Sequence, residues 1–236
     1  MPEFLSQFGA PDMALYACVK LIGFGFIISF VLLYRLKAPF SLCAFSLGLW
    51  NALAYTLFVQ GNQRLFWGLQ GDEVTIAAMY EMFAHGGFLR DFAYAHLPPF
   101  YPPLFFWAFA LSGKMLGMHG ILIGKMASAV SIFLGPLFIF FLARAVARRY
   151  EISRPDFFGL LVAAGSTVLF SWDVIILKPY EWLTAFGVVG WSALLLFDVR
   201  EKQMTARKIL AYGISGGFLF LTYYFWFFLA ALGVSL

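Results

Sequence analysis

The chain has 236 residues, of which 62% are hydrophobic and only 12% are charged; its mean hydropathy is +0.84 and its formal net charge is +4. Soluble domains average about 45–50% apolar and about 25% charged residues, so the composition excludes a soluble globular protein and predicts an integral membrane protein. The positive charge does not indicate a nucleic-acid partner, because most Lys and Arg residues lie in short connectors between apolar runs, where the positive-inside rule explains them.

Hydrophobic runs predict six membrane-spanning helices, since a span needs about 20 mostly apolar residues. In chain order they cover about 14–34, 40–60, 120–142, 156–176, 181–198 and 209–234. An apolar segment at about 103–118 is shorter and contains Ser112-Gly113-Lys114, which predicts an interfacial or re-entrant helix. We therefore expect an all-α polytopic bundle of about six transmembrane helices, with interfacial helices in its first large loop, that forms one transmembrane domain over residues 1–236. The uncapped apolar run at the C-terminus predicts that this domain is the N-terminal part of a longer chain.

Basic residues predict the orientation of the bundle. Ten of the 16 Lys and Arg residues lie in the connectors after the first, third and fifth predicted spans: Arg35, Lys37, Arg144, Arg148, Arg149, Arg154, Arg200, Lys202, Arg207 and Lys208. The positive-inside rule places these connectors in the cytoplasm. The loop 61–103 then faces outward, and we expect a multi-pass protein of the plasma or inner membrane whose active face is non-cytoplasmic.

Two adjacent acids, Asp72 and Glu73, open the most informative part of that loop. An apolar stripe at i, i+3, i+4 and i+7 predicts a helix over 72–84, which Asp72 can cap and Gly86-Gly87 can end. Asp72 is predicted to be an N-cap, and this is compatible with a further role, because a capped acid fixed in place can also act as a catalytic base or bind a metal. Glu73 is either a solvated first-turn acid favoured by the helix dipole or a second catalytic acid.

Other candidate site residues lie on the same predicted side of the membrane: Arg64, Arg90, Asp91, His96, Tyr101, Asp173, Lys178, Tyr180 and Glu181. Prolines around Tyr101 stiffen residues 98–103, which either line a groove for a substrate or pack over helix ends. Lys178 suits a phosphate as a compact cation, whereas Glu181 fits the first turn of a helix begun by Pro179. A single loop histidine such as His96 is more often neither a ligand nor a proton carrier.

Several classes of site have no signal in the sequence. There is no Walker loop, dinucleotide fingerprint, zinc motif or nucleophile triad, so no nucleotide cofactor is expected. Cys18 and Cys43 are predicted near opposite membrane faces and should not form a disulfide. A divalent metal ion at Asp72 remains one open alternative.

The order of these features resembles the GT-C superfamily of membrane glycosyltransferases, which use polyprenyl-phosphate sugars. Gly71-Asp72, Tyr101-Pro102-Pro103-Leu104, Lys178-Pro179-Tyr180-Glu181 and Thr222-Tyr223-Tyr224 look like the N-terminal membrane domain of the arabinofuranosyltransferase AftA family, over about residues 40–236. The superfamily resemblance implies that Asp72 is the catalytic base or metal-linked acid of an inverting-type transfer. The narrower resemblance, to the AftA family, implies an arabinofuranose donor and a cell-envelope glycan acceptor. Glu73 after the aspartate departs from the pattern.

Two other functions stay open at the level of sequence. A transporter or flippase of lipid-linked sugars would place ionisable residues at mid-membrane and show broken helices in repeated halves. A non-catalytic membrane subunit would scaffold an assembly and need a second polypeptide for any turnover.

Overall fold

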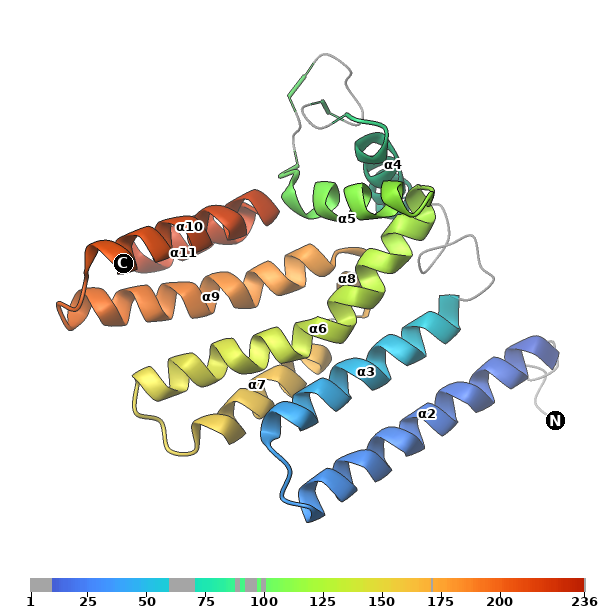
Figure 1. Cartoon of the computed structure of the whole chain (residues 1–236), viewed down its shortest axis with the longest axis horizontal. Helices are drawn as coiled ribbons and strands as arrows, with labels where there is room; N and C mark the ends of the chain where they lie inside the picture. Colours follow the sequence, from blue (N-terminus) through green and yellow to red (C-terminus); the bar gives the residue numbers. More distant parts are fainter. Residues whose placement is uncertain are drawn as a thin grey trace.

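The structure is a computed structural model that describes residues 10–59, 71–87, 90–91, 97–98, 101–170 and 172–235, with the backbone alone at 10–19, 21–22, 172–173 and 233–235. Every regular element in these residues is a helix (Figure 1). In chain order the helices are α2 (Ala10–Arg35), α3 (Phe40–Val59), α4 (Asp72–Ala84), α5 (Leu104–Met115), α6 (Gly120–Arg149), α7 (Pro155–Leu169), α8 (Trp172–Leu177), α9 (Pro179–Arg200), α10 (Ala206–Thr222) and α11 (Phe225–Ser235).

Three of these helices, α3, α6 and α9, are long and apolar enough to cross a membrane. Large apolar side chains face outward from the bundle as well; on α2, for example, Phe24 is 62% exposed and Ile28 is 58% exposed. Such exposed apolar surface is costly in water and favourable against lipid tails. The sequence prediction of a helical membrane protein is confirmed at this level.

Two predicted spans are interrupted. The segment 156–176 divides where Phe170 takes an extended conformation (ψ 137°) between α7 and α8. The segment 209–234 divides where Tyr223 is extended (φ −163°, ψ 106°) between α10 and α11. Hydropathy measures only how apolar a segment is, whereas these breaks come with tertiary ring contacts: Phe170 lies 5.6 Å from Phe186, and Tyr223 lies 5.6 Å from Tyr180.

The C-terminal helices α10 and α11 both pack on α9. The indole N–H of Trp191 donates to the carbonyl of Tyr212 in α10 at 3.0 Å, and its ring lies 5.4 Å from Phe227 in α11. Contacts with both helices from one side chain require the chain to turn back after α10, and Figure 1 shows the C-terminus beside α10. A single 26-residue span, as the sequence predicted here, is therefore replaced by a helical hairpin.

Small residues let the central helices approach closely. Gly48 of α3 packs on the backbone of Phe133 in α6, and Gly135 of α6 packs on the ring of Trp182 in α9. Ala127, Ser128 and Ser131 of α6 are buried as well, and such small residues suit close helix packing in membranes.

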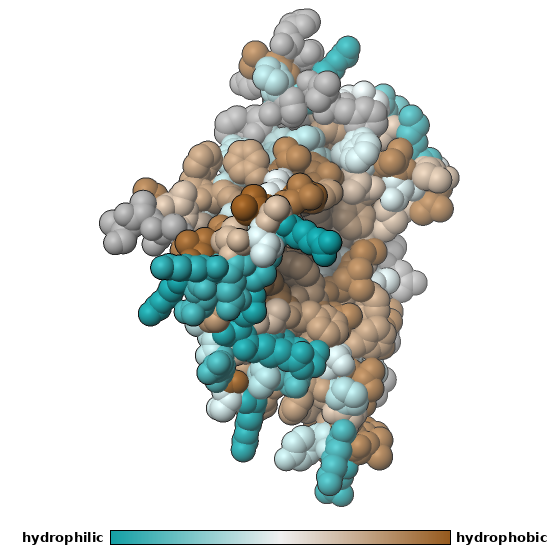
Figure 2. Space-filling view, turned by 60° about the vertical axis from the view of Figure 1, so that its left-hand side comes forward, coloured by the Kyte–Doolittle hydropathy of each residue, from teal (hydrophilic) through white to brown (hydrophobic). Residues whose placement is uncertain are grey.

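The two ends of the bundle differ in charge. The helices α4 and α5 lie at the end where α6 begins, and the turns α2–α3, α6–α7 and α9–α10 lie at the opposite end (Figure 1). Figure 2 shows hydrophilic side chains gathered on the side that carries these turns, beside apolar surface.

The helix α5 is too short to cross the membrane. At 12 residues it is about 18 Å long, whereas the hydrocarbon core is about 30 Å thick.

Ion pairs hold the basic end together. The buried carboxylate of Asp198 accepts from Arg149 at 2.5 Å, from Lys208 at 2.9 Å and from the Tyr212 hydroxyl at 2.8 Å. These contacts join α6, α9 and α10 through one side chain that is only 2% exposed. The sequence reasoning did not single out Asp198; an acid among basic connectors was the available signal.

Candidate functional site

The helix α4 has the bounds that the sequence predicted, but its cap differs. Gly71 is the N-cap, with φ at 53°, and Asp72 is the first helical residue. Glycine adopts this left-handed conformation without the steric cost of a Cβ, so the prediction of Asp72 as the cap is wrong by one position. At the other end, Gly86 has φ at 92° just after the helix, as expected for its stop.

The predicted apolar stripe of α4 is buried and fixes the helix in place. Ile76, Met79, Tyr80 and Phe83 are between 1% and 3% exposed. The ring of Phe106 in α5 lies 5.0 Å from Tyr80 and 5.0 Å from Tyr180 at the start of α9. Aromatic packing therefore holds the first turn of α9 beside α4, although about 100 residues separate them in the sequence.

This packing brings Lys178 to Asp72. Lys178 lies between α8 and α9, and its Nζ is 2.7 Å from Oδ2 of Asp72 and 3.9 Å from Oε1 of Glu181. Burial by itself would lower the pKa of the Lys178 ammonium, but the hydrogen bond to Asp72 and the charge of Glu181 outweigh it and raise that pKa above its ordinary value. One cation is thus shared by two carboxylates from different helices.

Two tyrosines complete the cluster. The phenol of Tyr223, at the break between α10 and α11, lies within electrostatic range of the Glu181 carboxylate, and its ring lies 5.6 Å from that of Tyr180. Tyr101 lies within electrostatic range of Lys178, Asp72 and Glu181; burial first, and then the two acids, raise its pKa against the opposing effect of Lys178. We call Asp72, Tyr101, Lys178, Glu181 and Tyr223 the Asp72–Lys178 site.

Two predicted site residues turn out to be buried in the protein interior. Glu73 is 1% exposed, so the prediction of a solvated first-turn acid is wrong. The reason is helical geometry: Glu73 precedes Ile76 and Ala77 by three and four residues and shares their buried face. It lies within electrostatic range of Lys125, whose Nζ also donates to the carbonyl of Val59 at 2.9 Å. Tyr180 is 1% exposed as well.

The other predicted residues are only partly placed. Arg90 is exposed, whereas Asp91 is 6% exposed and its amide donates to the carbonyl of Leu97 at 3.0 Å. Asp173 belongs to α8, by its backbone. Arg64 and His96 lie outside the described residues, as does much of the loop 61–103.

Sequence reasoning left out two residues at this end of the bundle. Tyr223 was quoted only for a family resemblance; its position after a polar threonine in an otherwise apolar run was the available signal. Glu81 accepts a hydrogen bond from the amide of Gly120 and so ties α4 to the N-terminus of α6. An acid at a helix N-terminus is favoured by the helix dipole.

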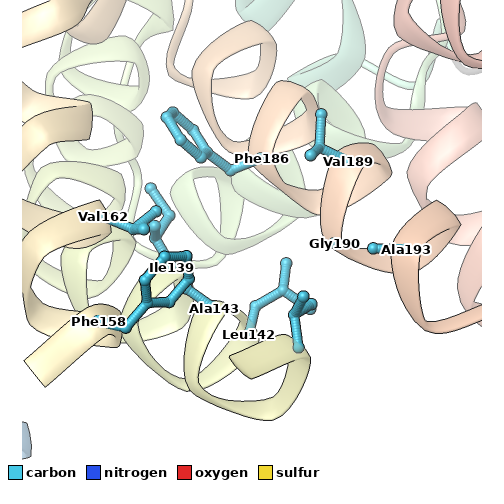
Figure 3. A pocket seen from close by; sticks show the side chains of 10 residues that line it. Ile139, Leu142, Ala143, Phe158, Val162, Phe186, Val189, Gly190 and Ala193 are labelled. Carbon is cyan, nitrogen blue, oxygen red and sulfur yellow. The ribbon is translucent and has the colours of Figure 1, made fainter. Parts of the chain in front are cut away.

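A separate apolar cavity lies between α6, α7 and α9 (Figure 3). It has a volume of about 190 Å³ and is lined only by apolar residues, among them Leu142, Phe158 and Phe186. Neither Asp72 nor Lys178 lines it. It can hold hydrocarbon but offers no group for acid–base chemistry.

Comparisons with family models, with curated proteins and with solved structures found no match to this chain. The described residues define its class, an all-helical membrane protein, by their helices and their exposed apolar surface. Within that class, the Asp72–Lys178 site brings an acid and a cation together at the end of the bundle where α6 begins.

Proposed function

We propose that this chain is a membrane glycosyltransferase that moves a sugar from a polyprenyl-phosphate donor to a cell-envelope glycan acceptor, with Asp72 as the base. The single observation that supports this most is the ion pair between Lys178 and Asp72, at 2.7 Å. An inverting transfer needs a carboxylate near the attacking hydroxyl and a cation near the departing phosphate. Residues far apart in the sequence supply both groups in one place.

The proposed step is a single displacement. The acceptor hydroxyl oxygen bonds to the anomeric carbon of the donor sugar as the bond from that carbon to the phosphate oxygen breaks. Asp72 takes the hydroxyl proton, and the lipid phosphate leaves with the electron pair of the broken bond. Lys178 stabilises the negative charge on that phosphate. When the phosphate binds Lys178, it competes with Asp72 for the ammonium and leaves the carboxylate able to accept a proton.

Glu181 and the two tyrosines position Lys178 in this proposal. The second carboxylate, 3.9 Å from Nζ, helps keep the lysine charged. Tyr223 lies beside Glu181, and Tyr101 supplies a hydroxyl and a ring near the charged groups. A sugar ring suits such a mixture of aromatic and hydrogen-bonding surface.

A divalent metal at Asp72 is less well supported by the ligands at hand. In the part of the chain that the structure describes, no three His, Cys, Asp or Glu side chains come together as metal ligands. The carboxylate of Asp72 already pairs with an ammonium. We therefore assign the phosphate-binding charge to Lys178.

The polyprenyl tail places the reaction at a membrane surface. A long isoprenoid chain stays in the bilayer, so the protein must bind the sugar-phosphate head at the membrane surface. We expect α4 and the first turn of α9 to lie at that surface. We expect this end of the bundle to be the non-cytoplasmic one, because the opposite end carries the basic turns. A six-span topology would count α2, the α7–α8 pair and α10 as crossings beside α3, α6 and α9, with α11 turned back against α9.

The test is sugar transfer by membranes that contain Asp72→Asn, supplied with a labelled lipid-linked sugar and acceptor. Loss of a general base costs about 10²–10⁴-fold in rate, so we expect at least a hundredfold loss. Asp72 is 64% exposed, so the variant should fold normally, since exposed ion pairs contribute little to stability. Full transfer by Asp72→Asn would remove this residue from the mechanism.

Asp156→Asn is a matched control. Asp156 also pairs with a cation, Arg144 at 2.5 Å, and is 41% exposed, but it lies at the basic end of the bundle. The control should keep wild-type transfer. An equal loss in both variants would mean that general damage, and not the loss of a base, slows the reaction.

A transporter of lipid-linked sugars is the second candidate, and one observation favours it. Two predicted spans are broken, at Phe170 and at Tyr223, and discontinuous helices are typical of secondary transporters. The second break contributes Tyr223 to the Asp72–Lys178 site. Counterflow of a labelled lipid-linked sugar in proteoliposomes, without formation of a glycosidic bond, would support transport over transfer.

A further inference from the structure

A second hollow lies at the other end of the bundle, where α2 turns into α3. Its volume is about 460 Å³, and its lining includes Phe30, Tyr34, Arg35, Lys37, Phe40 and Cys43. We call it the α2–α3 hollow. The volume lies within the about 300–1,000 Å³ that small-molecule sites usually have. Two cations and an apolar floor therefore meet in one space at the end of a helix that can cross a membrane.

A charged residue occupies a strained backbone position at this hollow. Lys37 has φ at 52°, a left-handed conformation that glycine adopts at much lower cost. In the described residues, the other non-glycine positions with positive φ are Glu151, Arg154 and Lys202, all in turns of the basic end. Turns at the opposite end place glycine at such positions, as in Gly71, Gly86 and Gly117.

This contrast indicates that charge matters at the basic end. Three of its four strained positions hold Lys or Arg where glycine would relieve the backbone. At Lys37 such a residue also lines a hollow with an apolar floor. A strained residue that persists points to a role beyond folding.

We propose that the α2–α3 hollow binds one anionic phospholipid of the leaflet on the basic side. Its phosphate lies between Arg35 and Lys37, and the first carbons of an acyl chain lie on Phe30, Phe40 and Cys43. Charge complementarity selects this occupant, because the mouth is cationic and the floor is apolar. Basic pockets at the cytoplasmic ends of membrane helices suit lipid head groups for the same reason.

Native mass spectrometry of the full chain in detergent micelles tests this with phosphatidylglycerol and phosphatidylcholine as probes. We expect one phosphatidylglycerol to be retained at least tenfold more tightly than phosphatidylcholine. A cation near an anionic lipid surface contributes about fivefold to affinity, or about 1 kcal/mol. Lys37→Gly should therefore bind phosphatidylglycerol about fivefold more weakly, and the double variant with Arg35→Gln on the order of 25-fold more weakly.

Lys37→Gly is an informative variant because it separates binding from folding. Glycine relieves the positive φ, so the variant should unfold at no lower temperature than the wild type while it loses lipid affinity. Lys202→Gly is the matched control: it relieves a φ of 54° and removes the same charge at a turn outside the hollow. The control should retain the lipid.

Three results would overturn the proposal. Equal loss of lipid in Lys37→Gly and Lys202→Gly would indicate diffuse surface charge in place of a site. Equal retention of the two lipids would remove the role of the head-group charge. Displacement of phosphatidylglycerol by millimolar inorganic phosphate would show that the hollow takes free phosphate. None of these results depends on glycosyltransfer at Asp72.

Discussion

Substituting Gly48 by alanine should loosen the central contact of the bundle. An ideal Cβ on Gly48 would lie 2.0 Å from the carbonyl oxygen of Phe133 and 2.9 Å from its carbonyl carbon. Ordinary van der Waals contact begins at 3.4 Å, so α3 must move away from α6 by more than about 1 Å. The obstacle is backbone and cannot turn aside as a flexible side chain could.

The cost follows from the packing that this movement disturbs. A gap of 0.5–1 Å forfeits about a quarter to a half of each dispersion contact along the interface, and overpacked cores lose about 1–3 kcal/mol. We expect a loss of about 2–3 kcal/mol. For a chain of this size, that lowers the unfolding temperature by roughly 4–12 °C.

Thermal unfolding in one detergent, followed by circular dichroism, measures this change. Gly165→Ala in α7 is the matched control, because its Cβ would have nothing within 4 Å. Alanine favours a helix over glycine by about 1 kcal/mol, so the control should unfold at the same or a higher temperature. If Gly48→Ala unfolds no earlier than the wild type, α3 and α6 do not approach each other this closely.

Two further predictions concern the charged clusters. Asp198→Asn should lower the free energy of unfolding by about 2–4 kcal/mol, because the buried carboxylate accepts hydrogen bonds from three donors. Asp156→Asn, at a more exposed ion pair, should lower it by no more than about 1 kcal/mol. Urea unfolding in detergent measures both changes. Folding raises the pKa of Lys178 above its ordinary value of 10.5. The ion pairs of Lys178 therefore stabilise the protein fully at pH values below 10.5, and this stabilisation is lost as the pH rises through the pKa of the folded state. Above pH 10.5, the stability advantage of the wild type over Lys178→Met should therefore shrink; an advantage that does not change with pH would contradict the pairing with Asp72.

Local patterns predicted part of the candidate site. The stripe of α4 is a repeat within one helix, so its bounds, its buried face and the glycine stop followed from the sequence. The same periodicity would have placed Glu73 on the buried face, but its charge suggested a solvated role. Arg64, His96 and the side chain of Asp173 lie outside what the structure describes, so their roles stay predictions.

The breaks at Phe170 and Tyr223 could not be read from hydropathy. A window average records that a segment is apolar, and both halves of each broken helix are apolar. The extended residues are accompanied by aromatic contacts with α9, which depend on where that helix lies. Asp198 escaped notice for the same reason, because its three partners come from two other helices, α6 and α10.

The sequence by itself determined that this chain is a helical membrane protein whose basic residues gather in the connectors at one end, because composition and connector charge are properties of the chain alone. It also put an acid at the start of α4 and a lysine before α9. Only the tertiary structure decided that these two side chains meet and that Glu73 turns inward. Close packing of α4, α5 and α9 through aromatic rings sets those distances, and no local pattern contains them.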